Sequence, residues 1–126
     1  MPTFIETPTV VPSVGTRPKR IEEYVGRVNS GTALLSVARM QSPEGWVEPA
    51  QRPAFTEVTL VLAGCLSVVC NGEVREVRAG QAVITHPGET IRYSTPHAGG
   101  AEYVAVCVPA FSPDTVHRLD DPGTSP

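Results

Sequence analysis

An acidic residue in the middle of the sequence stands among strongly apolar neighbours. Glu57 begins the segment EVTLVLAG. Alternate side chains of a β-strand share one face, so Thr59 and Val61 are expected on the same face as Glu57. Burial raises the pKa of a carboxyl group, and a carboxyl group with a raised pKa can act as a general acid or base. The alternative is structural: Glu57 pairs with Arg39 or Arg52 and closes the mouth of a barrel.

Two further side chains could move protons. Ile91 and Tyr93 share one face of a predicted strand, so Tyr93 points inward if Ile91 does. The Tyr93 hydroxyl could then orient a carbonyl group or donate a proton, whereas at the rim of a barrel it would be an ordinary strand residue. His86 has an unperturbed pKa close to physiological pH and could also transfer protons, or it lies at the barrel edge. Glu57, Tyr93 and His86 are therefore the candidate catalytic residues.

Other side chains could hold a substrate near these groups. The fork of an arginine matches two oxygens of a carboxylate or an enolate, so Arg39 or Arg52 could hold an anion. Arg39 could equally reach solvent from an edge strand. Trp46 is the single tryptophan and is a stacking surface, a plug of the barrel floor or a dimer contact. The candidate substrate-binding residues are Arg39, Gln51, Arg52, Thr59, Trp46 and Tyr103.

Composition limits the class of protein and its partners. The chain has 126 residues, which fits one domain. Its net charge is −3, and no basic patch is apparent, so neither nucleic acid nor a membrane surface is a predicted partner. The longest apolar run, about residues 58–63, is too short to span a bilayer, and the N-terminus does not resemble a secretory signal. The three cysteines do not form a disulfide framework and fit buried positions in a cytoplasmic protein.

Turn signals divide the sequence into about eight short strands and no convincing helix. Asn71-Gly72 is typical of a type I′ hairpin turn, and Gly64 is expected to break a strand. The segment 21–31 is ambiguous between a strand and a turn. This pattern predicts an all-β fold, either a closed barrel or a two-sheet jelly roll. The predicted strands are 32–40, 55–63, 65–70, 73–78, 81–86, 89–95 and 101–108.

The chain is expected to have three parts. Residues 1–20 are rich in proline and predict an extended N-terminal arm, which suits pairing into a homodimer. Residues 21–111 form the barrel. Residues 112–126 form a C-terminal tail that is expected to be loose beyond Leu119. Within this tail, residues 112–118 have helix-turn character and could fold back over a barrel mouth.

The spacing of glycine, proline and Glu57 resembles the motifs of cupins. The second part of their first motif is a glutamate, six residues and a glycine, which matches Glu57 and Gly64. Their second motif is a glycine, five residues, Pro-x-Gly, two residues and a histidine; here Gly80 and Gly88 match, and His86 takes the proline position. The resemblance covers roughly residues 33–109. It implies a single-domain cupin barrel, also called a double-stranded β-helix, and the run from Tyr103 resembles the ethanolamine-utilisation type of cupin.

The metal ligands of cupins are mostly missing from this sequence. The positions of the two histidines in the first motif fall on Gln51 and Pro53, or on Ala50 and Arg52 with the longer spacing. The third histidine is replaced by Ile91. A transition metal needs several imidazole or carboxylate ligands, and of the usual set only Glu57 remains. No cofactor is therefore expected. A divalent metal would need a rebuilt site on Glu57, Gln51 and His86, with His97 as a further possible ligand.

Three functions are compatible with these residues. The first is a small-molecule enzyme that uses metal-independent acid/base chemistry in the barrel, of the isomerase, dehydratase, cyclase or lyase type. The second is a metal-dependent cupin enzyme, an oxygenase or an isomerase, with a rebuilt site. The third is a cupin that binds a metabolite without catalysis. In each case the predicted partner is a small molecule, and no nucleic acid is expected.

Overall fold

The computed structural model describes residues 1–119 and contains β-strands but no helix among them. The predicted all-β class is confirmed. The predicted looseness beyond Leu119 concerns residues outside the described part of the chain. The strands are β1 (Thr9–Val11), β2 (Arg20–Val25), β3 (Ser36–Ser42), β4 (Trp46–Val47), β5 (Thr56–Cys70), β6 (Glu73–Arg78), β7 (Ala82–Thr85), β8 (Ile91–Thr95) and β9 (Ala101–Val108).

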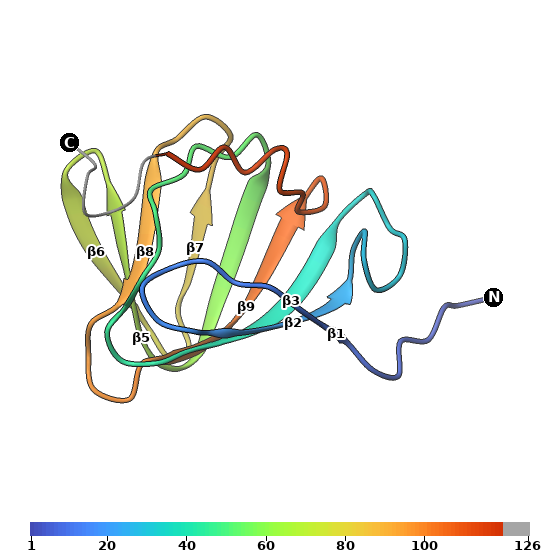
Figure 1. Ribbon diagram of the computed structural model, residues 1–126, viewed down its shortest axis with the longest axis horizontal. Helices are drawn as coiled ribbons and strands as arrows, with labels where there is room; N and C mark the ends of the chain where they lie inside the picture. The colour runs from blue at the N-terminus through green and yellow to red at the C-terminus, as the bar shows by residue number, and fades with distance from the viewer. Residues whose placement is uncertain (120–126) are drawn as a thin grey trace.

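The long strand β5 organises the sheet. The order of strands is β1-β2-β3-β9-β5-β8-β4, and β6 and β7 also pair with β5. The first half of β5 pairs with β7 and β9, and its second half pairs with β6 and β8. Because different partners flank the two halves, the sheet curls, as Figure 1 shows. The curled sheet forms a barrel whose inner face carries alternate residues of each strand.

Glycine determines how β5 bends. The predicted break at Gly64 is wrong, because β5 runs through it as one strand of 15 residues. Gly64 has a φ of +78°, and the register between β5 and β9 shifts just before it, between Val61 and Ala63. The predicted turn at Asn71-Gly72 is confirmed, since both residues have positive φ (54° and 75°) and join β5 to β6. Gly64 therefore bends β5 and does not end it.

A segment near each end of the described chain lies against the barrel, whereas the first residues extend away from it (Figure 1). Part of the predicted arm joins the sheet, because β1 pairs with β2. The arm then continues to β4, where the indole nitrogen of Trp46 donates a hydrogen bond to the carbonyl of Val14 at 3.0 Å. At the other end, residues 112–116 form a turn, and Val116 packs against Phe55 with only 1% of its surface exposed. The two ends thus cover opposite parts of the inner face.

The main apolar core fills one end of the barrel. It consists of Trp46, Val61, Leu66, Val68, Val77, Ile91, Tyr93, Ala101 and Tyr103. A smaller cluster of Phe55, Cys107 and Val116 lies on the tail side. Between the two clusters the inner face carries polar side chains. None of the described segments is a helix long and apolar enough to cross a membrane.

Candidate functional site

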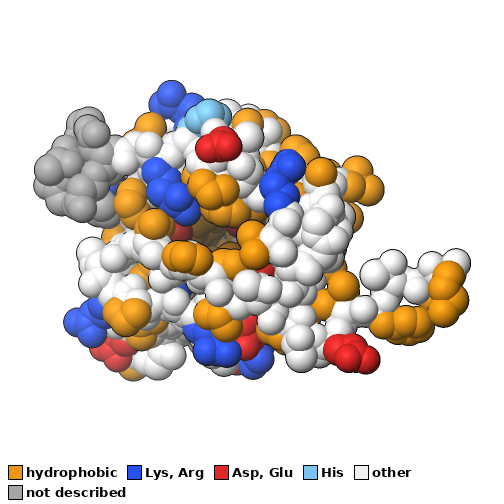
Figure 2. All heavy atoms as spheres, turned by 45° about the vertical axis from the view of Figure 1, so that its right-hand side comes forward, with side chains coloured by type: hydrophobic (Ala, Val, Ile, Leu, Met, Phe, Trp, Pro, Cys, Tyr) orange, Lys and Arg blue, Asp and Glu red, His pale blue; other side chains and the backbone are white. Residues whose placement is uncertain are grey.

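A cavity of about 440 Å³ opens into the barrel between the two apolar clusters. Residues of β2, β3, β5, β8 and β9 form its walls, and Pro12, Ser13 and Val14 of the arm lie along it. Figure 2 shows the opening as a hollow edged by hydrophobic side chains, with Lys or Arg side chains near its rim. A concave, mostly apolar space with a few polar groups is the usual form of a ligand site.

Glu57 lies at the centre of the cavity wall with only 8% of its surface exposed. The Tyr93 hydroxyl donates a hydrogen bond to its Oε1 at 3.0 Å, and the Cys107 thiol donates to its Oε2 at 3.6 Å. Burial raises the pKa of Glu57, although the hydrogen bond from Tyr93 opposes this. Burial and the nearby Glu57 charge also raise the pKa values of Tyr93 and Cys107. Both groups therefore keep their protons and act as donors.

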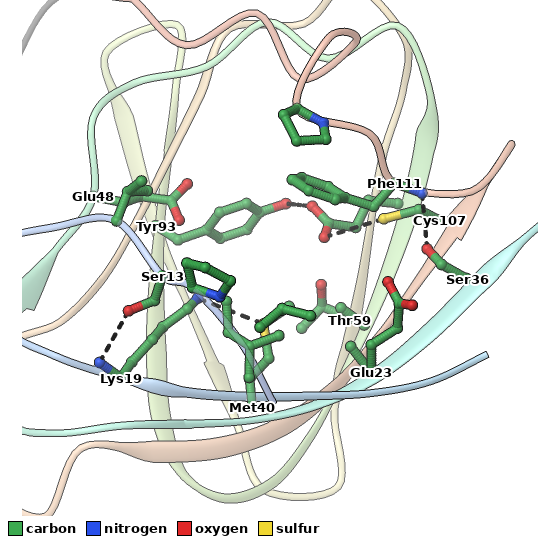
Figure 3. A pocket seen from close by; sticks show the side chains of 18 of the residues that line it. Ser13, Lys19, Glu23, Ser36, Met40, Glu48, Thr59, Tyr93, Cys107 and Phe111 are labelled. Atoms are coloured by element: carbon green, nitrogen blue, oxygen red, sulfur yellow. Dashed lines mark hydrogen bonds between the residues drawn. The ribbon is translucent and has the colours of Figure 1, made fainter. Parts of the chain in front are cut away.

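A second buried carboxyl group, Glu48, was missed by the sequence analysis. Its Oε2 has no hydrogen-bond partner within residues 1–119, and the residue is only 6% exposed. Burial raises its pKa to about 7, with Lys19 opposing the shift and Glu57 adding to it. Figure 3 shows the Glu48 carboxyl group pointing into the cavity beside Tyr93. A buried polar atom without a partner is costly, so this oxygen is a candidate ligand contact.

Lys19 contacts two aromatic residues of the buried core and was also missed. Its Nζ lies 4.1 Å from the centroid of the Trp46 ring and 5.5 Å from that of Tyr103. It donates a hydrogen bond to the Tyr103 hydroxyl at 3.2 Å. Two more cations, Arg27 and Arg118, line the cavity from opposite ends of the chain. No local pattern reveals this group, because its members lie far apart along the chain.

Five of the residues predicted from sequence do meet in the cavity. Glu57, Tyr93, Gln51, Thr59 and Tyr103 all line it and are buried. Strand alternation correctly placed Thr59 beside Glu57 and Tyr93 on the inner face. Gln51 is fixed by two backbone hydrogen bonds of 2.8 Å to Ile91. The positions of these residues are compatible with binding, and their roles stay predictions.

Of the two positions left open for His86, the structure shows the one at the barrel edge. The preceding residue, Thr85, points into the barrel and is buried, so strand alternation sends the next side chain outward. The His86 side chain is 66% exposed and lies 3.3 Å from Glu89. His86 therefore does not serve as a proton donor in the cavity, and the rebuilt metal set of Glu57, Gln51 and His86 does not come together.

Three predicted substrate contacts also lie elsewhere. Arg39 points outward from β3, because its neighbours Ala38 and Met40 face the cavity, and it pairs with Glu102 at 2.6 Å. Arg52 is exposed and donates a hydrogen bond to Thr90 at 3.1 Å. Trp46 is fully buried in the core and is not part of the cavity lining, so among its predicted roles the structural one fits its position.

Solved structures share the architecture of this chain. A protein of Thermotoga maritima described as a predicted oxalate decarboxylase matches with a TM-score of 0.68 and 20% identity, covering 81% of this chain and 91% of that one. A cupin 2 conserved barrel domain protein of Salinispora arenicola has a TM-score of 0.62 and 18% identity, over 71% and 75%. This chain has the cupin fold. The EutQ protein of Clostridium difficile also matches, with a TM-score of 0.62 and 20% identity over 73% and 63%. At these identities the likeness shows the cupin fold alone.

The metal site that the cupin fold implies does not fit this chain. Glu57 is the one residue kept from the usual ligand set, and its two oxygens already accept hydrogen bonds from Tyr93 and Cys107. No histidine is among the described residues that line the cavity. The donor set around Glu57 therefore lacks the imidazole nitrogens that a transition metal prefers. That no cofactor is needed stays a prediction.

A curated relative corrects the functional prediction. The chain is 44% identical over 99 residues to the protein named endoribonuclease YbeY of Myxococcus xanthus, and no protein-family model matches it. The match covers 79% of this chain but only 34% of the relative, so the chain spans about a third of that protein's length. The relative is named for an activity on RNA. The predictions of a small-molecule cupin, catalytic or metabolite-binding, and of no nucleic-acid partner are therefore wrong.

Proposed function

We propose that this chain acts in RNA processing, as a cupin unit that binds a single-stranded segment of RNA and holds one unstacked nucleotide in its cavity. The observation that carries the proposal is the 44% identity to a protein named an endoribonuclease. The match covers about a third of that relative. We therefore assign the cutting step to a unit corresponding to the unmatched two thirds, and the handling of RNA to the cupin unit.

The cavity has the size and the walls for a nucleobase. Single-stranded RNA is recognised mainly through bases that leave the stack, rest on aromatic side chains and form hydrogen bonds along their edges. Phe55, Tyr93 and Tyr103 supply aromatic walls in the cavity of about 440 Å³. The free Oε2 of Glu48 and the amide of Gln51 are polar groups at which a base edge could be read.

The cations of the cavity suit the phosphate groups on either side of such a nucleotide. Lys19, Arg27 and Arg118 line the cavity, although the chain as a whole carries a net charge of −3. A local group of three cations can hold one or two phosphates, whereas a duplex contact would need a longer basic surface. This explains how an acidic chain can bind RNA: the contact is short and confined to the cavity.

A second candidate is that the cupin unit itself cuts RNA. The observation in its favour is the Glu48 pKa of about 7, which is suited to proton transfer at neutral pH. Glu48 would take the proton of a ribose 2′-hydroxyl while that oxygen attacks the adjacent phosphorus. The bond to the 5′-oxygen would break, the leaving oxygen would take a proton from water, and the hydroxide so formed would take up the proton held by Glu48. The products would be a 2′,3′-cyclic phosphate and a 5′-hydroxyl end.

Fluorescence anisotropy with a labelled single-stranded RNA oligomer tests the proposal. We expect saturable binding at low salt, weaker binding of the same sequence as a duplex, and competition by mononucleotides. Lys19→Met and Arg118→Gln should each weaken binding at least several-fold. Arg75→Gln is the matched control, because Arg75 is exposed on β6 outside the cavity. Absence of saturable binding, or equal losses in all three variants, would overturn the proposal.

The same RNA, analysed on a denaturing gel, separates the two candidates. If the cupin unit only binds RNA, the purified chain leaves the oligomer intact. Cleavage that yields cyclic phosphate ends and disappears in Glu48→Gln would establish the second candidate instead. Cleavage that persists in Glu48→Gln would exclude Glu48 as the base.

A further inference from the structure

A group of metal-ligating side chains lies outside the cavity, on the outer face of the barrel. Cys65 of β5, Glu76 of β6 and His97 of the β8–β9 loop each offer one ligand atom, and these atoms lie within 4.8 Å of one another. None of the three lines the cavity. We propose that Cys65, Glu76 and His97 bind a zinc ion, at a site separate from the proposed RNA site.

The register of the sheet brings the first two residues together. Cys65 pairs with Arg78, and Ser67 pairs with Glu76, so Cys65 and Glu76 are diagonal neighbours on one face of β5 and β6. Leu66, between Cys65 and Ser67, points the other way into the core. Cys65 therefore faces away from the core, yet it is only 4% exposed.

The loop between β8 and β9 supplies the third residue. His97 lies in the turn that connects these strands, and its carbonyl accepts a hydrogen bond from Gly100 at 3.1 Å. Its Nε2 contacts Oε2 of Glu76 directly. Three separate elements thus deliver a thiol, a carboxylate and an imidazole to one point.

The ligand atoms of Cys65, Glu76 and His97 favour zinc over other metal ions. Zinc is bound in proteins by cysteine, histidine and carboxylate groups in tetrahedral geometry, and three protein ligands leave the fourth position for water or a further ligand. A thiol with carboxylate and imidazole neighbours does not suit calcium or magnesium, which prefer oxygen ligands alone. Burial and the Glu76 charge raise the pKa of Cys65, so the thiol is protonated without metal and zinc would release that proton to solvent.

The competing explanation is an ion-pair group without metal. Arg78 contacts Oε1 of Glu76 at 3.0 Å, while His97 contacts Oε2. The hydrogen bond from His97 lowers the pKa of Glu76, as an ion pair would require. The Cys65 thiol also donates a hydrogen bond to Glu76, so an ion-pair group without metal accounts for all three side chains. Only a bound metal would hold Cys65 as a thiolate, so a metal–thiolate bond distinguishes the two explanations.

Cobalt substitution tests the site through the thiol. Titration of the purified chain with Co²⁺ should give a thiolate-to-cobalt charge-transfer band in the near ultraviolet that saturates at one equivalent, and Zn²⁺ should remove it. Cys65→Ser should abolish this band, and His97→Ala should weaken cobalt binding at least tenfold. The matched controls are Cys70→Ser and His86→Ala, because both residues lie outside the group.

The cobalt titration is informative only if the variants are folded. His97 lies in an exposed loop, so His97→Ala is expected to fold, and circular dichroism checks this. No charge-transfer band, or a band retained in Cys65→Ser and lost in Cys70→Ser, would overturn the zinc site. RNA binding is measured separately, so failure of the zinc site leaves the proposed function intact.

Discussion

The Tyr93 hydroxyl donates a hydrogen bond of 3.0 Å to Oε1 of Glu57 and joins β8 to β5 across the inside of the barrel. The same hydroxyl lies 3.3 Å from the Thr85 hydroxyl of β7. Since Cys107 of β9 contacts the other carboxyl oxygen, side chains from four strands meet at Glu57. This network fixes the orientation of the carboxyl group.

Tyr93→Phe should disturb this network without opening a large cavity. Loss of the hydrogen bond removes a group that lowers the pKa of Glu57, so that pKa should rise further. A buried hydrogen bond to a charged group contributes about 1.5–3 kcal/mol, and the variant should lose about that much stability near neutral pH. Urea denaturation measures the loss. Tyr24→Phe, outside the cavity lining, is the control and should change stability by less than about 0.5 kcal/mol.

Glu48 should make stability depend on pH. Its pKa in the folded chain is about 7, against an ordinary value of 4.5, so between these values the folded state binds more protons than the unfolded state. Stability must therefore fall as pH rises through this window. The penalty reaches roughly 3 kcal/mol above pH 7, since each pKa unit corresponds to 1.36 kcal/mol.

Glu48→Gln should remove this dependence. Relative to the unchanged chain, the variant should gain stability from about pH 4.5 to about pH 7 and then keep a constant advantage. Chemical denaturation at several pH values measures the difference, which includes the coupling of the two carboxyl groups, since the Glu57 charge contributes to the Glu48 shift. Glu44→Gln, at an exposed position, is the control. A constant difference between Glu48→Gln and the unchanged chain would show that Glu48 does not titrate as described.

Local patterns in the sequence were sufficient to predict most strands and one wall of the cavity. The turn at Asn71-Gly72 requires positive φ at both positions, and alternation along β5 and β8 places Glu57 and Tyr93 inside. Alternation predicts which side chains face inward only if the orientation of at least one residue of the strand is already known. For His86 and Arg39 this orientation was open, and only pairing with neighbouring strands shows that both side chains face outward.

The remaining parts of the site depend on contacts between distant segments. Lys19 reaches the cavity because the arm crosses to β4. There the indole nitrogen of Trp46 donates a hydrogen bond to the carbonyl of Val14. Glu48 follows Trp46 by two residues in a segment interrupted by proline. The composition of this segment is typical of a turn, which is usually exposed, so burial of Glu48 was not predicted. Extended alternation with the buried Trp46 is the one signal that could have revealed it. Net charge says nothing about the three cations Lys19, Arg27 and Arg118 gathered in one cavity, so composition could not reveal them.

Gly64→Ala should destabilise the barrel far more than a change at another glycine of similar conformation. A Cβ at Gly64 would collide with the carbonyl oxygen of Gly100, and the backbone there is held by a hydrogen bond from Cys65. Gly72 has almost the same φ, +75° against +78°, but has open space around it. Gly72→Ala should cost about 1–2 kcal/mol, from the left-handed conformation alone.

The collision should add about 1–3 kcal/mol or more in Gly64→Ala. Midpoints of urea denaturation compare the two variants. Equal losses would show that β5 and the β8–β9 loop can separate at no cost, which would contradict the close approach of Gly64 to Gly100.

The contact of Lys19 with the Trp46 ring should stabilise the packing of the arm against the barrel. The ammonium group lies 4.1 Å from the ring centroid and is partly removed from water, where such contacts contribute about 1 kcal/mol or somewhat more. Lys19→Met keeps an unbranched apolar stem but removes the charge and the hydrogen bond to Tyr103. Thermal unfolding followed by the emission of Trp46, the single tryptophan, should show a lower midpoint for this variant. Arg75→Met, at an exposed pair on β6, should leave the midpoint unchanged, and an equal decrease in both variants would mean that the ring contact has no specific effect.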